Sequence, residues 1–203
     1  MRVLPYGDRA LLAEYGDAEE TIAAYRALEA TRPPGVVALV PAARTVLVRV
    51  EPTALTLGNA ERWVRETEPI ESEDDPGALV VIPVHYDGPD LSDTADLLGM
   101  SVAGLIAAHS AADWRCGFVG FSPGFGYLSA ADWAHEVPRL ATSRPRVPAG
   151  SVAVAAGFAG VYPRESPGGW RILGRTDADL WDVDRTPPAL LIPGARVRFE
   201  AIP

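Results

Sequence analysis

Residues 117–174 decide the fold of this chain, with the sequence GFVGFSPGFGYLSAADWAHEVPRLATSRPRVPAGSVAVAAGFAGVYPRESPGGWRILG. Glycine and proline recur throughout, and short runs of Val, Phe, Tyr, Ile and Leu lie between them. Disordered Gly/Pro-rich segments lack such apolar content, so this stretch is predicted to fold. Because glycine permits unusual backbone angles and proline fixes φ, the stretch predicts a surface built largely from main chain.

Short strands are predicted on both sides of this stretch. Strand-like runs occur at residues 78–86, 116–121, 151–156, 160–162, 170–175, 189–191 and 197–202. Many short strands joined by glycine and proline turns favour a β-sandwich or a closed barrel. Two short helices are predicted at residues 91–98 and 102–108, with Ser92 and Ser101 as their N-caps.

The first part of the chain has a different pattern. Strands are predicted at residues 1–7, 10–15, 36–41 and 45–50, and helices after Asp17, which is the expected N-cap, and at about residues 57–67. This order favours a small α+β unit with its helices on one face of a sheet.

An acidic segment, residues 66–77, follows this unit. Its sequence, ETEPIESEDDPG, is rich in acids and contains two prolines. This composition is typical of a linker, and it predicts a domain boundary between residues 1–76 and 77–203. The alternative is a solvated loop within one domain.

Composition places the chain among ordinary globular proteins, with 48% hydrophobic and 22% charged residues. Neither a membrane-spanning apolar run nor a signal peptide is visible. A single cysteine, Cys116, excludes an internal disulfide. Together these features predict a cytoplasmic location.

Charge is distributed unevenly along the chain. Residues 1–113 carry eight arginines and 19 acids, whereas residues 114–203 carry ten arginines and eight acids. The net charge of −9 argues against nucleic-acid binding, and the C-terminal part is the expected place for an anion. The chain has no lysine, which excludes a lysine Schiff base, a P-loop lysine and a biotin-carrying lysine.

Residues 120–124, GFSPG, match the G-x-S-x-G nucleophile elbow of α/β-hydrolases. In that elbow the residue after the serine supplies an oxyanion-hole N–H. Here that residue is Pro123, which has no N–H. A serine hydrolase is therefore excluded.

Two further motifs are also excluded. Residues 91–108 have the spacing of a helix-turn-helix, but residues 101–109, SVAGLIAAH, offer almost no polar groups for DNA. His85 and His135 have no companion ligands at the spacing of a zinc site.

Several side chains remain as candidates. His109, at the end of an apolar helix, is either a capping or core histidine, or else a general base or a ligand of an anionic substrate. Cys116 is expected to be a buried, inert thiol. Ser151 follows a Pro-Ala-Gly turn that would present its hydroxyl and amide together. Tyr127, Tyr162 and Trp170 line an apolar wall or belong to the core.

Five arginines lie among these turns, and guanidinium groups beside exposed amides suit carboxylate or phosphate recognition. The alternative is that each makes a structural ion pair. They are Arg144, Arg146, Arg164, Arg171 and Arg175.

At these residues the sequence resembles one bacterial family. The matching blocks are GFSPGFGYL (120–128), PRVPAGS (145–151), GVYP (160–163), SPGGW (166–170) and ILGRT (172–176), with YGDRALL (6–12) near the N-terminus. The family is that of the B subunit of 5-oxoprolinase, also described as allophanate hydrolase subunit 1 or the KipI-type kinase inhibitor. One departure is Trp114-Arg115, where the family often has a tyrosine and a β-branched residue; we expect it to affect packing more than chemistry.

The resemblance implies an α+β protein, in which a small N-terminal α/β domain precedes a cyclophilin-like β-barrel. It also implies the A and C subunits of 5-oxoprolinase as partners, and hydrolysis of the cyclic amide 5-oxo-L-proline to L-glutamate with ATP, with no activity for this chain alone. Related domains occur in urea carboxylase. An allophanate- or urea-directed subunit and an inhibitor of a histidine kinase are therefore the alternatives.

Position in or next to the matched blocks gives the candidate site. The residues expected to take part in catalysis are His109, Arg146 and Ser151. Those expected to bind the substrate or an anion are Pro123, Gly124, Tyr127, Pro148, Gly150, Tyr162 and Arg175. No metal is expected, and the site is expected to be shared with the C subunit.

Overall fold

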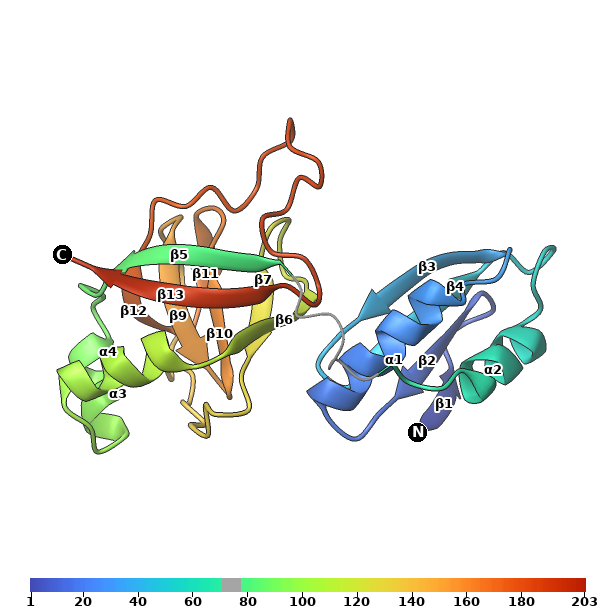
Figure 1. The fold of residues 1–203 in the computed structure, drawn as a ribbon, viewed down its shortest axis with the longest axis horizontal. Coiled ribbons are helices and arrows are strands. Elements are labelled where there is room, and N and C mark those ends of the chain that lie inside the picture. Colours follow the sequence, from blue (N-terminus) through green and yellow to red (C-terminus); the bar gives the residue numbers. More distant parts are fainter. Residues whose placement is uncertain (71–77) are drawn as a thin grey trace. The chain divides into compact units, whose positions relative to one another are not determined.

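The computed structural model describes residues 1–70 and 78–203, which form two compact units, residues 1–76 and 77–203 (Figure 1). Most of the acidic segment that is predicted to be a linker, residues 71–77, lies outside the described residues. Each unit is described by itself.

The first unit is a four-stranded antiparallel sheet covered by two helices. Its elements are β1 (Arg2–Pro5), β2 (Ala10–Glu14), α1 (Ala18–Ala30), β3 (Val36–Pro41), β4 (Thr45–Val50) and α2 (Leu57–Glu66), and the strand order is β1-β2-β4-β3. Val46, Val48 and Val50 alternate along β4 and point to one buried face. Both helices pack on this face, as the sequence predicts. Asp17 caps α1, because its side chain accepts a hydrogen bond from Glu20 N at 2.8 Å.

The second unit is a closed seven-stranded barrel with the order β10-β7-β6-β13-β5-β12-β9, so the predicted barrel is confirmed. The parallel pair β13 and β5 is flanked by antiparallel neighbours. The elements of the second unit are β5 (Leu79–His85), α3 (Leu91–Leu97), α4 (Val102–Ala111), β6 (Trp114–Val119), β7 (Gly126–Ser129), β8 (Arg144–Val147), β9 (Ser151–Ala155), β10 (Phe158–Val161), β11 (Ser166–Gly168), β12 (Arg171–Arg175) and β13 (Arg196–Ile202).

Some local predictions are wrong. The strand expected at residues 189–191 is only an isolated bridge between Trp181 and Ala189, and β7, β8 and β11 were not expected. Asp90 precedes α3 in place of Ser92, which lies inside the helix. Ser101 caps α4 as expected, accepting a hydrogen bond from Gly104 N at 3.0 Å.

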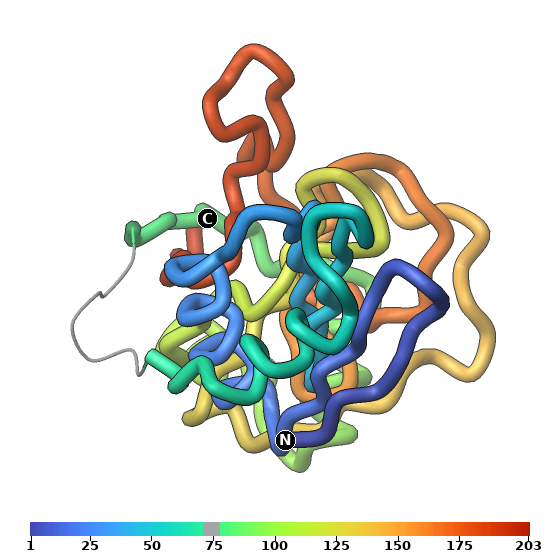
Figure 2. The backbone as a smooth tube through the Cα atoms, turned by 90° about the vertical axis from the view of Figure 1, so that its right-hand side faces the viewer, coloured from blue at the N-terminus to red at the C-terminus, as the bar shows by residue number. Residues whose placement is uncertain are grey.

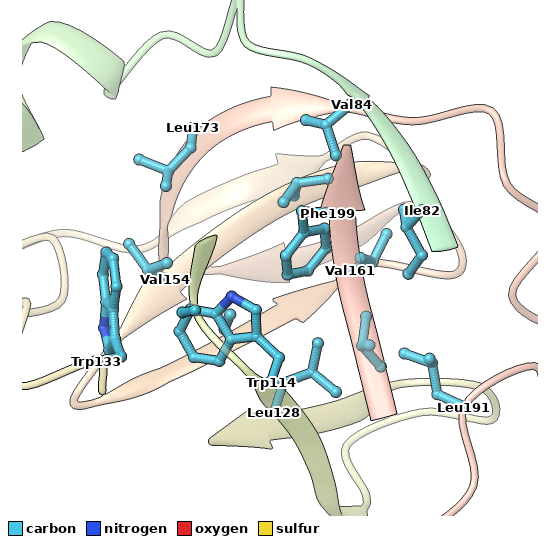
Figure 3. Close-up of a cluster of buried hydrophobic side chains, with 14 of the residues drawn as sticks. Ile82, Val84, Trp114, Leu128, Trp133, Val154, Val161, Leu173, Leu191 and Phe199 are labelled. Carbon is cyan, nitrogen blue, oxygen red and sulfur yellow. The ribbon is translucent and has the colours of Figure 1, made fainter. Parts of the chain in front are cut away.

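Large apolar side chains fill the barrel (Figure 3). Trp114, Leu128, Leu173 and Phe199 all point inward, and the helices α3 and α4 add Leu91, Ala95 and Leu105 to the same cluster. Among the described residues no single helix is long and apolar enough to cross a membrane. The pair α3 and α4 passes by length and composition but is bent by 90°.

Candidate functional site

Three turns of the deciding stretch meet around Tyr162. Gly150 N donates a hydrogen bond to Tyr162 O at 2.8 Å, and Tyr162 N donates to Ser151 O at 3.0 Å. Thr176 N donates to Gly150 O at 2.9 Å, which brings in the end of β12. We call residues 120–125, 148–151, 162–165 and 175–178 the barrel rim. The rim is held mainly by backbone hydrogen bonds, as its glycine and proline content predicts.

Turn 120–125 has an unusual backbone at Phe121, whose φ is +65°. This left-handed conformation is an outlier for a bulky residue. The phenyl ring is 56% exposed, and its centroid lies 5.4 Å from that of Phe125 and 6.1 Å from that of Tyr162. The neighbouring Ser122 Oγ is buried and has no hydrogen-bond partner among the described residues. The turn therefore presents an aromatic ring to solvent and withholds its hydroxyl.

Gly124 and Gly150 are required by close approach as well as by their positive φ angles of +84° and +76°. A Cβ on Gly124 would lie 3.0 Å from both Leu180 O and Trp181 Cβ. A Cβ on Gly150 would collide with the carbonyl oxygen of Thr176. These two predicted site residues thus hold the rim turns against the loop that follows β12.

Ser151 begins β9, where only 4% of its surface is exposed. In the sheet, Ser151 lies opposite Arg175 of the neighbouring strand β12, and Arg175 lies opposite His85 of β5. A cavity of about 370 Å³ adjoins these strand ends and is lined by Pro83, His85, Thr176, Asp177, Ala178 and Ile202. Ser151 and Arg175 are therefore brought together with Gly150, next to a cavity that sequence reasoning did not locate.

Three of the candidate arginines are paired with acids. Arg175 Nε lies 2.9 Å from Asp87 Oδ2, and Arg146 Nε lies 3.5 Å from Glu165 Oε1, both on the surface. Exposed pairs of this kind contribute only about 0–1 kcal/mol, so a carboxylate or phosphate can displace the protein's own acid. The third pair joins the partly buried Arg144 to the buried Asp90 and is structural.

Asp90 is a residue that sequence reasoning missed. Its exposed fraction is 5%, and its two oxygens accept hydrogen bonds from Arg144 Nη2 and from Ile172 N, each at 2.7 Å. This carboxylate ties the start of α3 to β12 and β8. No local pattern marks it, because both partners lie more than 50 positions away.

His109 lies inside the barrel and away from solvent. Its side chain is fully buried, Nδ1 is 2.8 Å from Tyr86 Oη, and its ring stacks on Phe199 with centroids 4.5 Å apart. Burial lowers the pKa of His109 to about 3. Nε2 has no partner among the described residues. Of the roles considered for this residue, the geometry is that of a core histidine, because a side chain without exposed surface cannot contact a substrate in this conformation.

The aromatic residues form a separate cluster. Tyr162 and Trp170 are 2% and 5% exposed, and Tyr127 is half-buried, with its ring stacked on Phe118 at 4.3 Å. Burial raises the pKa of Tyr127, against the opposing charge of Arg139. Burial likewise raises the pKa of Tyr162. Tyr162 and Trp170 are buried members of this cluster, so they belong to the core, which was one of the two roles considered for them.

No group of three or more His, Cys, Asp or Glu side chains suited to a metal ion occurs within residues 1–70 and 78–203. The rim thus combines backbone turns with two exposed arginines, Arg146 and Arg175, whose acidic partners can be displaced. It also includes the buried Ser151 at the start of β9, and a cavity adjoins it. This combination can bind and orient a small anion.

The family described as "Carboxyltransferase domain, subdomain C and D" matches residues 1–191. The B subunit of 5-oxoprolinase from Escherichia coli O157:H7 is 39% identical over 173 residues, which are 82% of this chain and 78% of that protein. The chain belongs to the family of 5-oxoprolinase B subunits. The B subunit from Bacillus subtilis (strain 168) is 38% identical over 61% of this chain and 53% of that protein.

Solved structures share the fold of this chain. TTHA0988 has a TM-score of 0.81 at 35% identity; the match covers 96% of this chain but only 40% of that one. PH0987 from Pyrococcus horikoshii has a TM-score of 0.59 at 36% identity, and the match covers 99% of this chain and 97% of that one. The Kluyveromyces lactis urea carboxylase, at 18% identity and a TM-score of 0.76, shows the fold alone.

Proposed function

We propose that this chain is the B subunit of an ATP-dependent 5-oxoprolinase, which opens 5-oxo-L-proline to L-glutamate in the cytoplasm together with the A and C subunits. The observation that carries the proposal is the 39% identity to a 5-oxoprolinase B subunit over 82% of the chain. The exposed arginines of the rim support it, because guanidinium groups suit the carboxylate of a small lactam.

The chemistry explains why such a site needs anion-binding groups. Transfer of the γ-phosphoryl group of ATP to the lactam carbonyl oxygen releases ADP and makes the ring carbon electrophilic. Water then adds to this carbon, and negative charge develops on oxygen. The C–N bond breaks as the nitrogen takes up a proton, and hydrolytic loss of inorganic phosphate leaves the new carboxylate of L-glutamate. Backbone amides and guanidinium groups stabilise such charge without a lysine, which this chain lacks.

The rim residues have distinct proposed roles. Arg175, beside Ser151, binds an anionic group by displacing Asp87, and Arg146 does the same by displacing Glu165. Residues 123–124 and 148–150 shape the backbone wall. Tyr127 and Tyr162 support that wall from the aromatic cluster, and His109 acts only through packing.

The chain alone is proposed to be inactive, because the rim forms one wall of a site that the C subunit closes. The test mixes the purified A, B and C subunits with 5-oxoproline and ATP and measures glutamate. Glutamate should form only when this chain is present. Equal formation without it would overturn the proposal.

Variants tested in the same assay show whether the rim residues contribute to the activity. Arg175→Ala and Ser151→Ala should each lower kcat/KM by about tenfold or more, which corresponds to ~1.4 kcal/mol of lost transition-state binding. Arg198→Ala is the control, since Arg198 is an exposed arginine on β13 outside the rim. If both rim variants keep the rate of the control, the rim is not the site.

A second candidate is a carboxyltransferase-type subunit acting on a urea derivative. The matched family description favours it, since it names a carboxyltransferase domain. The same subunits supplied with urea, bicarbonate, ATP and a biotin-carrying partner would then form a carboxylated product, and 5-oxoproline would give no glutamate.

A further inference from the structure

An exposed apolar surface lies beside the rim. Its members are large apolar side chains with exposed fractions between 37% and 77%: Val119, Phe121, Trp181, Val183 and Ile192. We call these five residues the apolar patch. Single exposed apolar residues are normal, but a contiguous group next to a candidate site marks an interaction surface.

Four of the five residues lie in or next to turn 120–125. Val119 pairs with Gly126 across β6 and β7, and Leu191, the neighbour of Ile192, would lie 3.0 Å from a Cβ on Gly126. Trp181 Cβ would lie 3.0 Å from a Cβ on Gly124, in the turn that carries Phe121. Most of the patch therefore adjoins turn 120–125, in which Phe121 has the strained φ of +65°. Strained conformations of this kind concentrate at functional surfaces.

Val183 lies in the long loop between β12 and β13, which projects away from the barrel in both views (Figures 1 and 2). The loop is braced internally. Arg185 Nη2 donates to the carbonyl oxygens of Asp179 and Pro188 at 3.2 and 2.9 Å. Asp182 N donates to Pro188 O at 3.0 Å, and Leu190 N donates to Leu180 O at 3.0 Å. A loop held in this way is preorganised, which lowers the entropic cost of docking.

Acids border the patch on the same loop. Residues 177–184 have the sequence DADLWDVD, in which Asp177, Asp179, Asp182 and Asp184 flank Trp181 and Val183. A partner complementary to this surface would present an apolar depression bordered by arginine or lysine side chains. In addition, this chain matches only 40% of the TTHA0988 chain, so a relative of this fold is continued by further polypeptide.

From these observations we propose that the apolar patch and its acidic loop are the docking surface for the C subunit. The inference rests on the proposed function and names the part of this chain that the partner covers. Docking here places the partner directly beside the Gly150 turn and Ser151, because Tyr162 contacts both Phe121 and that turn.

The experiment measures binding of the purified full-length chain to the C subunit by calorimetry. Val183→Glu and Phe121→Gly should each weaken binding by about tenfold or more. Glycine adopts a φ of +65° without strain, so Phe121→Gly removes the ring and keeps the turn. Leu97→Glu is the control, since Leu97 is 48% exposed on α3, outside the patch. Circular dichroism of each variant verifies that it folds.

The outcomes separate this inference from the function. Weak binding of both patch variants with normal binding of Leu97→Glu supports the inference, even if the assembled subunits make no glutamate. Wild-type affinity in both patch variants overturns it, even if glutamate forms. The inference is also overturned if Leu97→Glu weakens binding to the C subunit as much as the patch variants do. It is likewise overturned if sedimentation experiments show that the patch mediates only self-association of this chain.

Discussion

Acid should destabilise the barrel through His109. The imidazole is fully buried among Tyr86, Trp114, Trp133 and Phe199, and burial lowers its pKa to about 3. Burial also raises the pKa of Tyr86 to about 12, so its hydroxyl stays protonated and can donate to Nδ1 of the neutral ring. The folded state therefore holds His109 neutral throughout the mildly acidic range.

The sign and size of the effect follow from linkage. An unfolded chain protonates this histidine below pH ~6.5, whereas the folded chain does not until about pH 3. The unfolded state thus binds more protons, and stability falls as the pH drops through this window. The full slope is about 1.4 kcal/mol per pH unit, and it is reached only below pH ~6.5, where the unfolded histidine is half protonated. Lowering the pH from 6.5 to 4.5 should therefore remove about 2 kcal/mol through this group.

Urea unfolding at a series of pH values measures this effect, followed by tryptophan fluorescence, since four of the five tryptophans belong to the barrel unit. His109→Asn should be less stable at pH 7 but show a shallower loss on acidification, with the two curves converging by up to about 1.4 kcal/mol per pH unit. Leu105→Ala, a cavity variant of the same helix, retains the histidine and should keep the wild-type slope. Parallel curves for wild type and His109→Asn between pH 6.5 and 4.5 would refute the reasoning.

Three further predictions concern buried or strained positions. Asp90→Ala should lower the free energy of unfolding in urea by about 3 kcal/mol, because it leaves the partly buried guanidinium of Arg144 and the buried Ile172 amide without their acceptor; a loss no larger than that of an exposed Asp93→Ala control would contradict this. Gly150→Ala should lower thermal stability by clearly more than Gly157→Ala, since both have positive φ but only Gly150 faces a carbonyl oxygen, and equal losses would remove the steric argument. Burial raises the pKa of Cys116 to about 12, so a thiol reagent should label the native chain far more slowly than the urea-unfolded chain, and equal rates would show that the thiol is accessible.

Local signals in the sequence predicted local structure well. Asp17 and Ser101 are N-caps because each side chain reaches an amide three positions later, a relation fixed by helix geometry. The strand at residues 45–50 was also predicted, and in the structure its alternating valines point to one buried face. The strand β7 was missed, because its glycine-rich sequence becomes a strand only through pairing with β6 and β10.

The candidate site was harder to predict, since its members depend on contacts that are distant in sequence. Turns at Gly124 and Gly150 were predicted, because unusual backbone angles favour glycine, and both residues have a positive φ. The position of His109 was not evident. Its helix end suits a cap or a base, and only the closing of the barrel places Phe199, 90 positions later, against its ring.

The turn GFSPG shows how strain distinguishes a binding surface from a nucleophile. In a hydrolase elbow the strained turn exposes the serine hydroxyl at the top of a sheet. Here the positive φ lies one residue earlier, at Phe121, and Ser122 Oγ is buried. The turn therefore exposes an aromatic ring, whose apolar surface can be covered but cannot attack a carbonyl. Together with the missing N–H of Pro123, this geometry is not that of a nucleophile elbow, and it agrees with the recognition role proposed for the turn.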